Sequence, residues 1–224
     1  DHLVRQAVGE RAEQVLLGEG LMAVSAGSTV KTVVDFSTAK PASTRKIHAE
    51  LAEKGIAMVD APMTGGPAHA AEGRLNLAVG GARETVDRLR PLLEKIARNI
   101  VHAGPSGAGN TVKLLNNFMA IMNRTTASLA GLISEHEQVD LSTLLEFVSY
   151  SGGYSRGFES ELKTIIEGEF PLTFALELAR KDLRYMHEVA DQASRSSPLL
   201  TDLLSLFDSA VEGGYGKQDF HTIY

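Results

Sequence analysis

The stretch Gly109-Asn-Thr-Val-Lys-Leu-Leu-Asn-Asn117 opens an apolar run that continues to Ile133, and the rest of the chain is organised around it. Within it Lys113 and Asn117 are four residues apart, so on a helix they share one face, a turn apart. An ammonium group and a carboxamide are costly in an apolar helix unless they have partners. The spacing leaves two interpretations open: a functional pair, or a lysine that reaches solvent beside an incidental asparagine.

The composition narrows the class of protein. The chain has 224 residues, a formal net charge of -6 and a pI of about 5.7, which allows one large domain or two small ones. This mild acidity gives no electrostatic reason to expect nucleic acid or an anionic membrane as a partner. The absence of cysteine excludes a disulfide framework and fits a reducing cytoplasm. No apolar run is long enough to span a bilayer, so we expect a cytoplasmic protein.

The hydrophobic pattern changes near residue 106. Before it, short β-branched strands alternate with helices, which is typical of a largely parallel, layered sheet. Strands are expected near 31–36, 56–59, 75–79 and 99–102, and helices over 2–17, 41–54 and 83–96. After it we expect only helices, near 110–136, 141–149, 157–167, 172–191 and 198–212. The predicted fold class is α/β: a partial Rossmann-like doubly wound sheet over residues 1–106, followed by an all-α domain over 107–224.

Three short motifs match known signatures in an unsuitable context. Gly18-Glu-Gly-Leu-Met-Ala23 matches GxGxxA, but an expected helix rather than a strand precedes it. Ser37-Thr-Ala-Lys40 matches SxxK without its companion motifs. Gly153-Tyr-Ser-Arg-Gly157 matches the nucleophile elbow of hydrolases, which would make Ser155 a nucleophile, but it falls among expected helices. A serine hydrolase is therefore a minor alternative. The histidines show no paired metal spacing, so we assign no metal.

A second stretch, Asp60-Ala-Pro-Met-Thr-Gly-Gly66, follows an expected strand. Thr64 carries a hydroxyl, and Gly65 and Gly66 can bring bare backbone N–H groups close to a ligand. A loop of this kind at the carboxyl end of a strand suits a carboxylate. An ordinary tight turn after a strand explains the same residues equally well.

Four segments together resemble the β-hydroxyacid dehydrogenase family, in the family's order and spacing. They are the DxST turn at 35–38, the DAPxSGG…VGG segment at 60–81, the GxxxKxxNN segment at 109–117 and the F…KDL segment at 174–183. The resemblance implies an NAD(P)-dependent oxidoreductase that interconverts a small β-hydroxy acid and its semialdehyde or keto acid. It implies NAD or NADP as cofactor, a small carboxylate substrate, and a homodimer or homotetramer formed through the helical domain.

The resemblance also assigns roles to single residues. Lys113 is the catalytic general acid and base, since a partly desolvated lysine can exchange protons near neutral pH. The substrate is bound by Thr64, Gly65, Gly66 and Asn117. The cofactor is contacted by Thr38, Phe174, Lys181 and Asp182. These groups are expected to converge on one cleft between the two domains.

The chain departs from the family in a few places. Thr64 replaces the usual serine, and Leu129 stands where a glutamate is frequent. The GxGxxG unit that opens the family's pattern does not precede the first expected helix, so the 224 residues are expected to be inactive by themselves. A non-catalytic scaffold that binds a partner is the main alternative. The particular β-hydroxy acid and the choice between NAD and NADP are left open.

Overall fold

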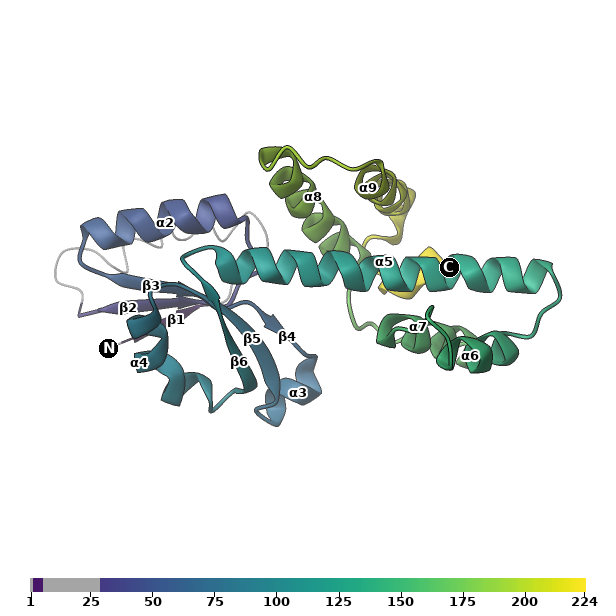
Figure 1. Ribbon diagram of the computed structural model, residues 1–224, viewed down its shortest axis with the longest axis horizontal. Helices are drawn as coiled ribbons and strands as arrows, with labels where there is room; N and C mark the ends of the chain where they lie inside the picture. Colours follow the sequence, from purple (N-terminus) through teal and green to yellow (C-terminus); the bar gives the residue numbers. More distant parts are fainter. Residues whose placement is uncertain (1, 6–28) are drawn as a thin grey trace. The chain divides into compact units, whose positions relative to one another are not determined.

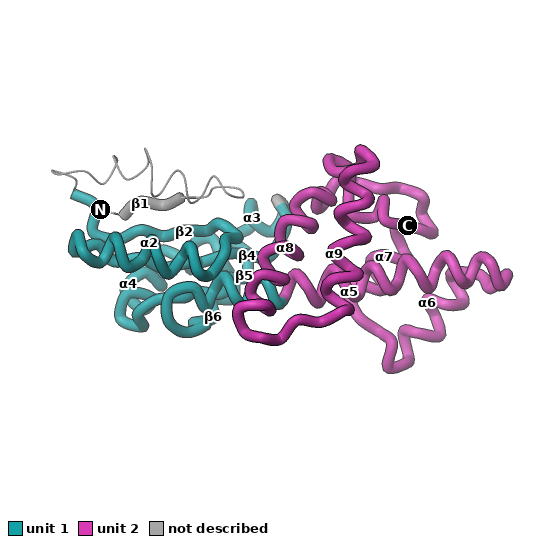
Figure 2. Tube along the Cα trace, turned by 90° about the horizontal axis from the view of Figure 1, so that it is seen from above, with its two compact units in different colours: residues 1–115 teal, residues 116–224 magenta. Residues whose placement is uncertain are grey.

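The computed structural model describes the backbone of residues 2–5 and the chain from residue 29 to residue 224. The chain divides into two compact units, Asp1–Leu115 and Asn116–Tyr224 (Figure 2). The division falls inside the longest helix, α5 (Ala108–His136). Lys113 therefore belongs to unit 1 and Asn117 to unit 2, although one continuous helix carries both.

Unit 1 is built on a sheet of six strands in the described part of the chain. They are β1 (His2–Arg5), β2 (Thr32–Asp35), β3 (Ala57–Asp60), β4 (Met63–Thr64), β5 (Leu75–Gly80) and β6 (Ala97–Gly104). The order is β1-β2-β3-β5-β4, with β6 paired to β5. Strands β1, β2 and β3 are parallel to one another, and β5 is parallel to β6. The sheet is mixed, because β5 runs antiparallel to β3 and β4.

The helix expected over residues 2–17 is wrong at its start. His2–Arg5 is strand β1, which pairs in parallel with β2. Without β1, the outer edge of strand β2 would present unpaired backbone N–H and C=O groups. The backbone of a short extended segment such as the one around Leu3-Val4 can pair with them. Periodicity alone cannot separate such a run from a helix. The remainder of that helix and the motif Gly18–Ala23 lie outside the described residues.

Two helices cover opposite faces of the sheet (Figure 1). Helix α2 (Pro41–Glu53) begins with proline at its first turn, as expected, and buries Ile47 and Leu51 in a cluster with Val33. Helix α4 (Arg83–Leu93) packs in a second cluster that includes Val34, the next residue of β2. Neighbouring strand residues point to opposite faces, so the two clusters form the two sides of a layered α/β unit.

Unit 2 is helical, as predicted. After α5 come α6 (Leu141–Ser149), α7 (Arg156–Glu167), α8 (Leu176–Gln192) and α9 (Pro198–Ala210), then a π turn (Val211–Tyr215) and a 3₁₀ turn (Phe220–Ile223). Residues 137–224, all of them described, contain an isolated bridge between Ala175 and Asp219 but no strand that joins the sheet. The fold class predicted from the sequence is confirmed. Among the described helices, none is long and apolar enough to cross a membrane.

Candidate functional site

The start of helix α5 is fixed by the carboxylate of Asp60, at the end of strand β3. Its two oxygens accept hydrogen bonds from the backbone N–H groups of Gly107, at 2.8 Å, and Asn110, at 2.9 Å. Asp60 is fully buried, and burial raises its pKa, although the bonds from those amides lower it in part. A negative charge at a helix start is favourable because the first N–H groups lack partners within the helix. The carboxylate of Asp60 therefore satisfies two backbone N–H groups at the start of α5.

Two glycines of the family segments allow the close approach of α5 to the sheet. A Cβ atom on Gly109 would lie 2.4 Å from the carbonyl oxygen of Ala78 in β5. A Cβ atom on Gly80 would lie 2.5 Å from Oδ1 of Asp60. Neither distance is possible for a real side chain, so both positions require glycine for packing. These residues position the helix and leave the chemistry to others.

Asn110 ties the same helix to the turn between β2 and α2. Its buried side chain accepts a hydrogen bond from the N–H of Ala39, at 2.9 Å, and donates one to Oγ1 of Thr44, at 3.1 Å. Within the turn, the N–H of Ser37 donates to Oδ1 of Asp35, at 2.9 Å. Thr38 lies between these two bonds, so its backbone is held at the carboxyl end of a parallel strand. The SxxK match at residues 37–40 is this strand-to-helix turn, as expected.

Lys113 lies in the second turn of α5, beyond these anchors. It is half-buried, and its neighbour Leu114 is fully buried. Thr64 lies in β4, four residues after Asp60, and its Oγ1 accepts a hydrogen bond from Asn76 Nδ2 at 3.3 Å. Asp60, which precedes Thr64 by four residues, also holds the start of the helix that carries Lys113, so this buried carboxylate connects the two segments within unit 1. The separation of the two side chains and their convergence on one cleft remain predictions.

In unit 2, Asn117 is held by a buried acid. Its Nδ2 donates to Oδ2 of Asp182 at 2.6 Å, and Lys181 Nζ lies 2.9 Å from Oδ1 of the same carboxylate. The ammonium group of Lys181 also lies 5.3 Å from the centre of the Tyr185 ring. Asn116 donates to Oδ1 of Asn117 at 3.2 Å, which fixes the orientation of that amide. Of the expected site residues, Asn117, Lys181 and Asp182 are thus brought together. Phe174, also in unit 2, lies half-buried against its core.

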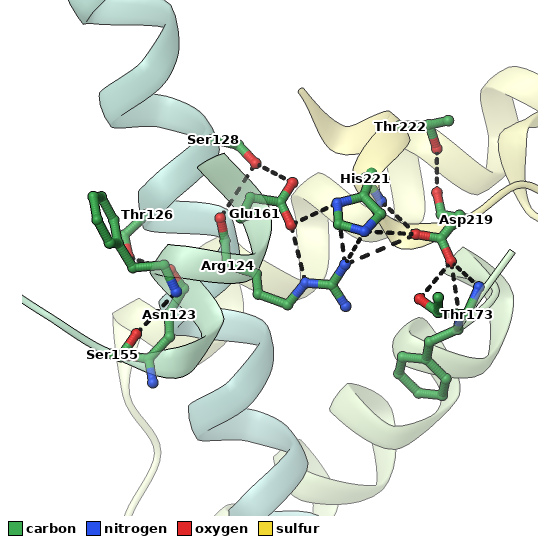
Figure 3. Close-up of polar contacts among 12 residues, drawn as sticks. Asn123, Arg124, Thr126, Ser128, Ser155, Glu161, Thr173, Asp219, His221 and Thr222 are labelled. Carbon is green, nitrogen blue, oxygen red and sulfur yellow. Dashed lines mark hydrogen bonds and ion pairs between the residues drawn. The ribbon is translucent and has the colours of Figure 1, made fainter. Parts of the chain in front are cut away.

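The sequence did not reveal a second polar cluster in unit 2, which Figure 3 shows. Arg124 on α5 donates from Nε to Oε2 of Glu161 at 3.0 Å, and its Nη2 lies 2.7 Å from Nε2 of His221. Nδ1 of His221 lies 2.8 Å from the same Glu161 oxygen, and Ser128 donates to Oε1 at 2.9 Å. Asp219 accepts hydrogen bonds from the backbone N–H of Phe174 and of His221. The cluster joins α5, α7 and the last residues of the chain.

The charges in this cluster compensate one another. Burial by itself would raise the pKa of Glu161, but His221 and Arg124 more than offset it, so the pKa is lowered. Burial by itself would also raise the pKa of Asp219. Backbone hydrogen bonds to its carboxylate, with the bond from Phe174 the strongest of them, outweigh burial, so the pKa of Asp219 is lowered. The signal in the sequence was Arg124, seven residues after Asn117 and so on the same helix face. Its partners, 37 and 97 residues away, carried no local signal.

The hydrolase alternative is wrong. Ser155 precedes α7 as its N-cap, and its Oγ accepts a hydrogen bond from the N–H of Phe158 at 3.0 Å. Phe147 and Val148, which would have to end a strand, lie in helix α6. Without a strand before it, Ser155 cannot form a nucleophile elbow. The match at residues 153–157 is a helix cap.

Comparison with known proteins agrees with the four family segments. Residues 6–104 match the NAD-binding domain of 6-phosphogluconate dehydrogenase, and residues 107–224 match the NAD-binding domain of NADP-dependent 3-hydroxyisobutyrate dehydrogenase. The chain is 36% identical over 213 residues to the NAD-dependent L-serine dehydrogenase of Pseudomonas aeruginosa, which covers 92% of this chain and 70% of that protein. It is 32% identical over 214 residues to the 2-(hydroxymethyl)glutarate dehydrogenase of Eubacterium barkeri, with 94% and 70% covered.

A solved structure shows the same fold. The 3-hydroxyisobutyrate dehydrogenase of Salmonella typhimurium superposes with a TM-score of 0.84 at 28% identity, over 99% of this chain and 78% of that one. The matches extend through both units and include the segments that hold Asp60, Lys113 and Asp182. The chain therefore belongs to the β-hydroxyacid dehydrogenase family of NAD(P)-dependent oxidoreductases.

Proposed function

We propose that this oxidoreductase interconverts a small β-hydroxy acid and its semialdehyde or keto acid, with Lys113 as the group that moves the proton. The observation that carries the proposal is the anchoring of Lys113: two buried side chains, Asp60 and Asn110, fix the start of its helix. A proton-transfer group must be held within hydrogen-bond reach of the reacting oxygen. Relatives named for L-serine and 2-(hydroxymethyl)glutarate support a small hydroxylated carboxylate as substrate.

The described residues fit a nicotinamide cofactor at one edge of the sheet. Dinucleotides bind outside the carboxyl ends of parallel strands, and β1, β2 and β3 are parallel. Thr38 lies directly after β2, and we propose that it contacts the cofactor together with Phe174, Lys181 and Asp182. When bound, the nicotinamide donates or accepts the hydride at the carbinol carbon.

Lys113 supplies the matching proton movement. In oxidation its amine accepts the proton of the substrate hydroxyl, and in reduction its ammonium returns a proton to the carbonyl oxygen. As a cation it also stabilises negative charge that develops on that oxygen. The substrate carboxylate lies against the Thr64 hydroxyl and the N–H groups of Gly65 and Gly66, which orients the carbinol carbon.

Asp182 acts through its two neighbours. Its carboxylate holds the amide of Asn117 by one oxygen and the ammonium of Lys181 by the other. Asn117 lies one helical turn after Lys113, so its amide can orient the substrate hydroxyl without titrating. We propose that Asp182 keeps Asn117 and Lys181 in place for substrate and cofactor.

We further propose that the 224 residues by themselves bind the cofactor weakly. They contain no GxGxxG sequence, which is the usual pyrophosphate loop of this fold. Calorimetric titration with NAD and NADP tests this, alongside the chain extended by βα units that carry such a loop. Micromolar binding by the 224 residues would contradict this part of the proposal.

The test of the lysine is Lys113→Ala in a cofactor-binding form of the protein. We expect kcat to fall by on the order of 10²-fold or more with the fold retained, because the proton-transfer group is removed. Lys46→Ala is the control, since Lys46 is exposed on helix α2 of the same unit. A kcat within a factor of about three of the parent would refute the role of Lys113. If the unsubstituted chain binds no cofactor even when extended, the scaffold alternative replaces this proposal.

We also propose that unit 2 forms a homodimer or homotetramer. Helices α5 and α6 expose large apolar side chains, among them Leu129, Ile133 and Phe147, with Phe147 71% exposed, and Tyr150, directly after α6, is exposed as well. Exposed apolar surface of this kind marks an interface in soluble proteins. Sedimentation equilibrium of the wild type and of Phe147→Ser tests this, and a wild type that stays monomeric at high concentration would refute it.

A further inference from the structure

Three polar residues lie in a row across neighbouring strands of unit 1. Thr64 of β4 is paired with Asn76 of β5, and Asn76 is paired with Asn99 of β6. The residues on either side of Asn76, Leu75 and Leu77, are buried in the core. Because strand residues alternate between faces, Asn76 lies on the face opposite that core. None of these three positions belongs to the sheet's apolar layer.

Their side chains form a directed series of hydrogen bonds. Asn99 Nδ2 donates to Oδ1 of Asn76 at 2.7 Å, and Asn76 Nδ2 donates to Oγ1 of Thr64 at 3.3 Å. With its oxygen engaged by Asn99, the amide of Asn76 presents its N–H side to Thr64. The threonine hydroxyl therefore acts as an acceptor in this bond.

That direction decides what Thr64 can offer to a ligand. A hydroxyl has one hydrogen and two lone pairs, so one that accepts from Asn76 must direct its hydrogen to another group. An ionised carboxylate only accepts hydrogen bonds, and a bond from a hydroxyl to it is charge-assisted and short. A hydroxyl fixed as a donor therefore suits an anionic group.

We propose that Asn76 is a positioning residue for the substrate carboxylate, because it keeps the Thr64 hydroxyl oriented as a donor. The inference rests on the proposed binding of a carboxylate at Thr64–Gly66. Asn76 itself makes no contact with the substrate, and Asn99 acts one step further away by fixing the amide of Asn76. Loss of Asn76 leaves the hydroxyl free to rotate, and that freedom must be lost again when the carboxylate binds.

The experiment is a titration of the 224-residue chain with 3-hydroxypropionate, followed by the NMR shifts of the Gly65 and Gly66 amides. The uncharged probe 1,3-propanediol is titrated in parallel. We expect Asn76→Leu to weaken carboxylate binding by roughly three- to tenfold, since one charge-assisted bond is weakened rather than removed. Thr64→Val removes the hydroxyl, so adding Asn76→Leu to it should change the affinity no further. The diol should respond to neither substitution.

Two further readouts separate positioning from a general effect on the sheet. Thr64→Val should shift the side-chain amide resonances of Asn76, which reports the bond directly. Asn99→Leu removes a cross-strand bond of the same kind but keeps the contact between Asn76 and Thr64, so it should weaken binding less than Asn76→Leu. Equal effects of these two leucine variants would indicate a structural role and overturn the proposal.

The remaining outcomes are distinct. Wild-type affinity in Asn76→Leu refutes the positioning role and leaves the carboxylate site intact. If Asn76→Leu weakens carboxylate binding by the same factor in the wild type and in Thr64→Val, the positioning role is refuted as well, because Asn76 would then act independently of the Thr64 hydroxyl. If the wild-type Gly65 and Gly66 amides show no saturable response to 3-hydroxypropionate, the carboxylate site itself is refuted, and the role of Asn76 with it.

Discussion

Replacement of Asp60 tests how the helix that carries Lys113 is held. Asp60→Ala leaves the backbone N–H groups of Gly107 and Asn110 buried without a partner. An unsatisfied buried donor costs about 1–3 kcal/mol, so two of them predict a loss of about 2–6 kcal/mol in the free energy of unfolding. Hydrogen exchange at these two amides should rise with it, because the first turn of α5 loses its cap.

Asp140 provides a matched control. Its carboxylate also accepts hydrogen bonds from two backbone N–H groups at a helix start, those of Ser142 at 2.8 Å and Thr143 at 3.2 Å. It differs in being exposed, so water replaces the lost acceptor. We expect Asp140→Ala to cost about 0.5–2 kcal/mol, the usual range for a helix cap. Equal costs at Asp60 and Asp140 in urea unfolding, or unchanged exchange at Gly107 and Asn110, would refute the assignment.

The pH dependence gives the same prediction a second readout. Burial raises the pKa of Asp60, so the folded state binds a proton more tightly than the unfolded state. Its contribution to stability is therefore fullest below the unfolded pKa and falls as the pH rises from there to the raised folded pKa. Asp60→Asn removes this titration. Between the unfolded and the folded pKa of Asp60, the free energy of unfolding of the wild type should fall relative to that of Asp60→Asn as the pH rises. A difference between the two proteins that stays constant with pH would contradict the raised pKa.

Three further predictions concern other described residues. Gly65 has a φ of +118°, so Gly65→Ala should lower the free energy of unfolding by about 1–3 kcal/mol, measured in urea. Gly66 is the control, because a Cβ atom there meets open space, and Gly66→Ala should change the free energy of unfolding by less than about 0.5 kcal/mol. Asp182→Asn places an N–H against one of its two donor partners, so unfolding should show a loss of about 1–3 kcal/mol, and no loss would contradict the anchoring role. The pKa values of Glu161 and Asp219 are lowered, so the stability they confer is present above their unfolded pKa values and is lost as the pH falls through their folded ones. The protection of unit 2 amides against hydrogen exchange, taken relative to the intrinsic rate at each pH, should therefore fall with acidification, and constant protection would contradict the lowered pKa values.

Most helices could be predicted because their boundaries carry local signals. Pro41 and Pro198 each stand at the first turn of a helix, and α6 has the predicted bounds of 141–149. Strand β6 is longer than predicted, Ala97–Gly104 rather than 99–102, because Arg98, which is polar and exposed, separates Ala97 from the apolar run. Strand β4 has only two residues and exists through its pairing with β5, which the local sequence does not reveal.

The candidate site was predicted as a set of residues rather than as an arrangement. Family segments indicated Lys113 and Asn117, but not that Asp182 holds the amide of Asn117 across 65 residues of chain. They also gave no sign that Asn76 donates to Thr64, because that bond depends on the register of two strands. Contacts of this kind follow from tertiary packing, which periodicity and motif spacing do not contain.

Burial separates the two kinds of residue within these family segments. Asp60, Gly109 and Asn110 are buried, and the contacts described above hold the start of α5 against the sheet and against the turn before α2. Lys113 and Thr64 are only half-buried. A segment can therefore combine residues that fix a helix with residues for which we propose a chemical role. Substitutions in the first group should lower stability before activity, and substitutions in the second should lower activity while the fold is retained.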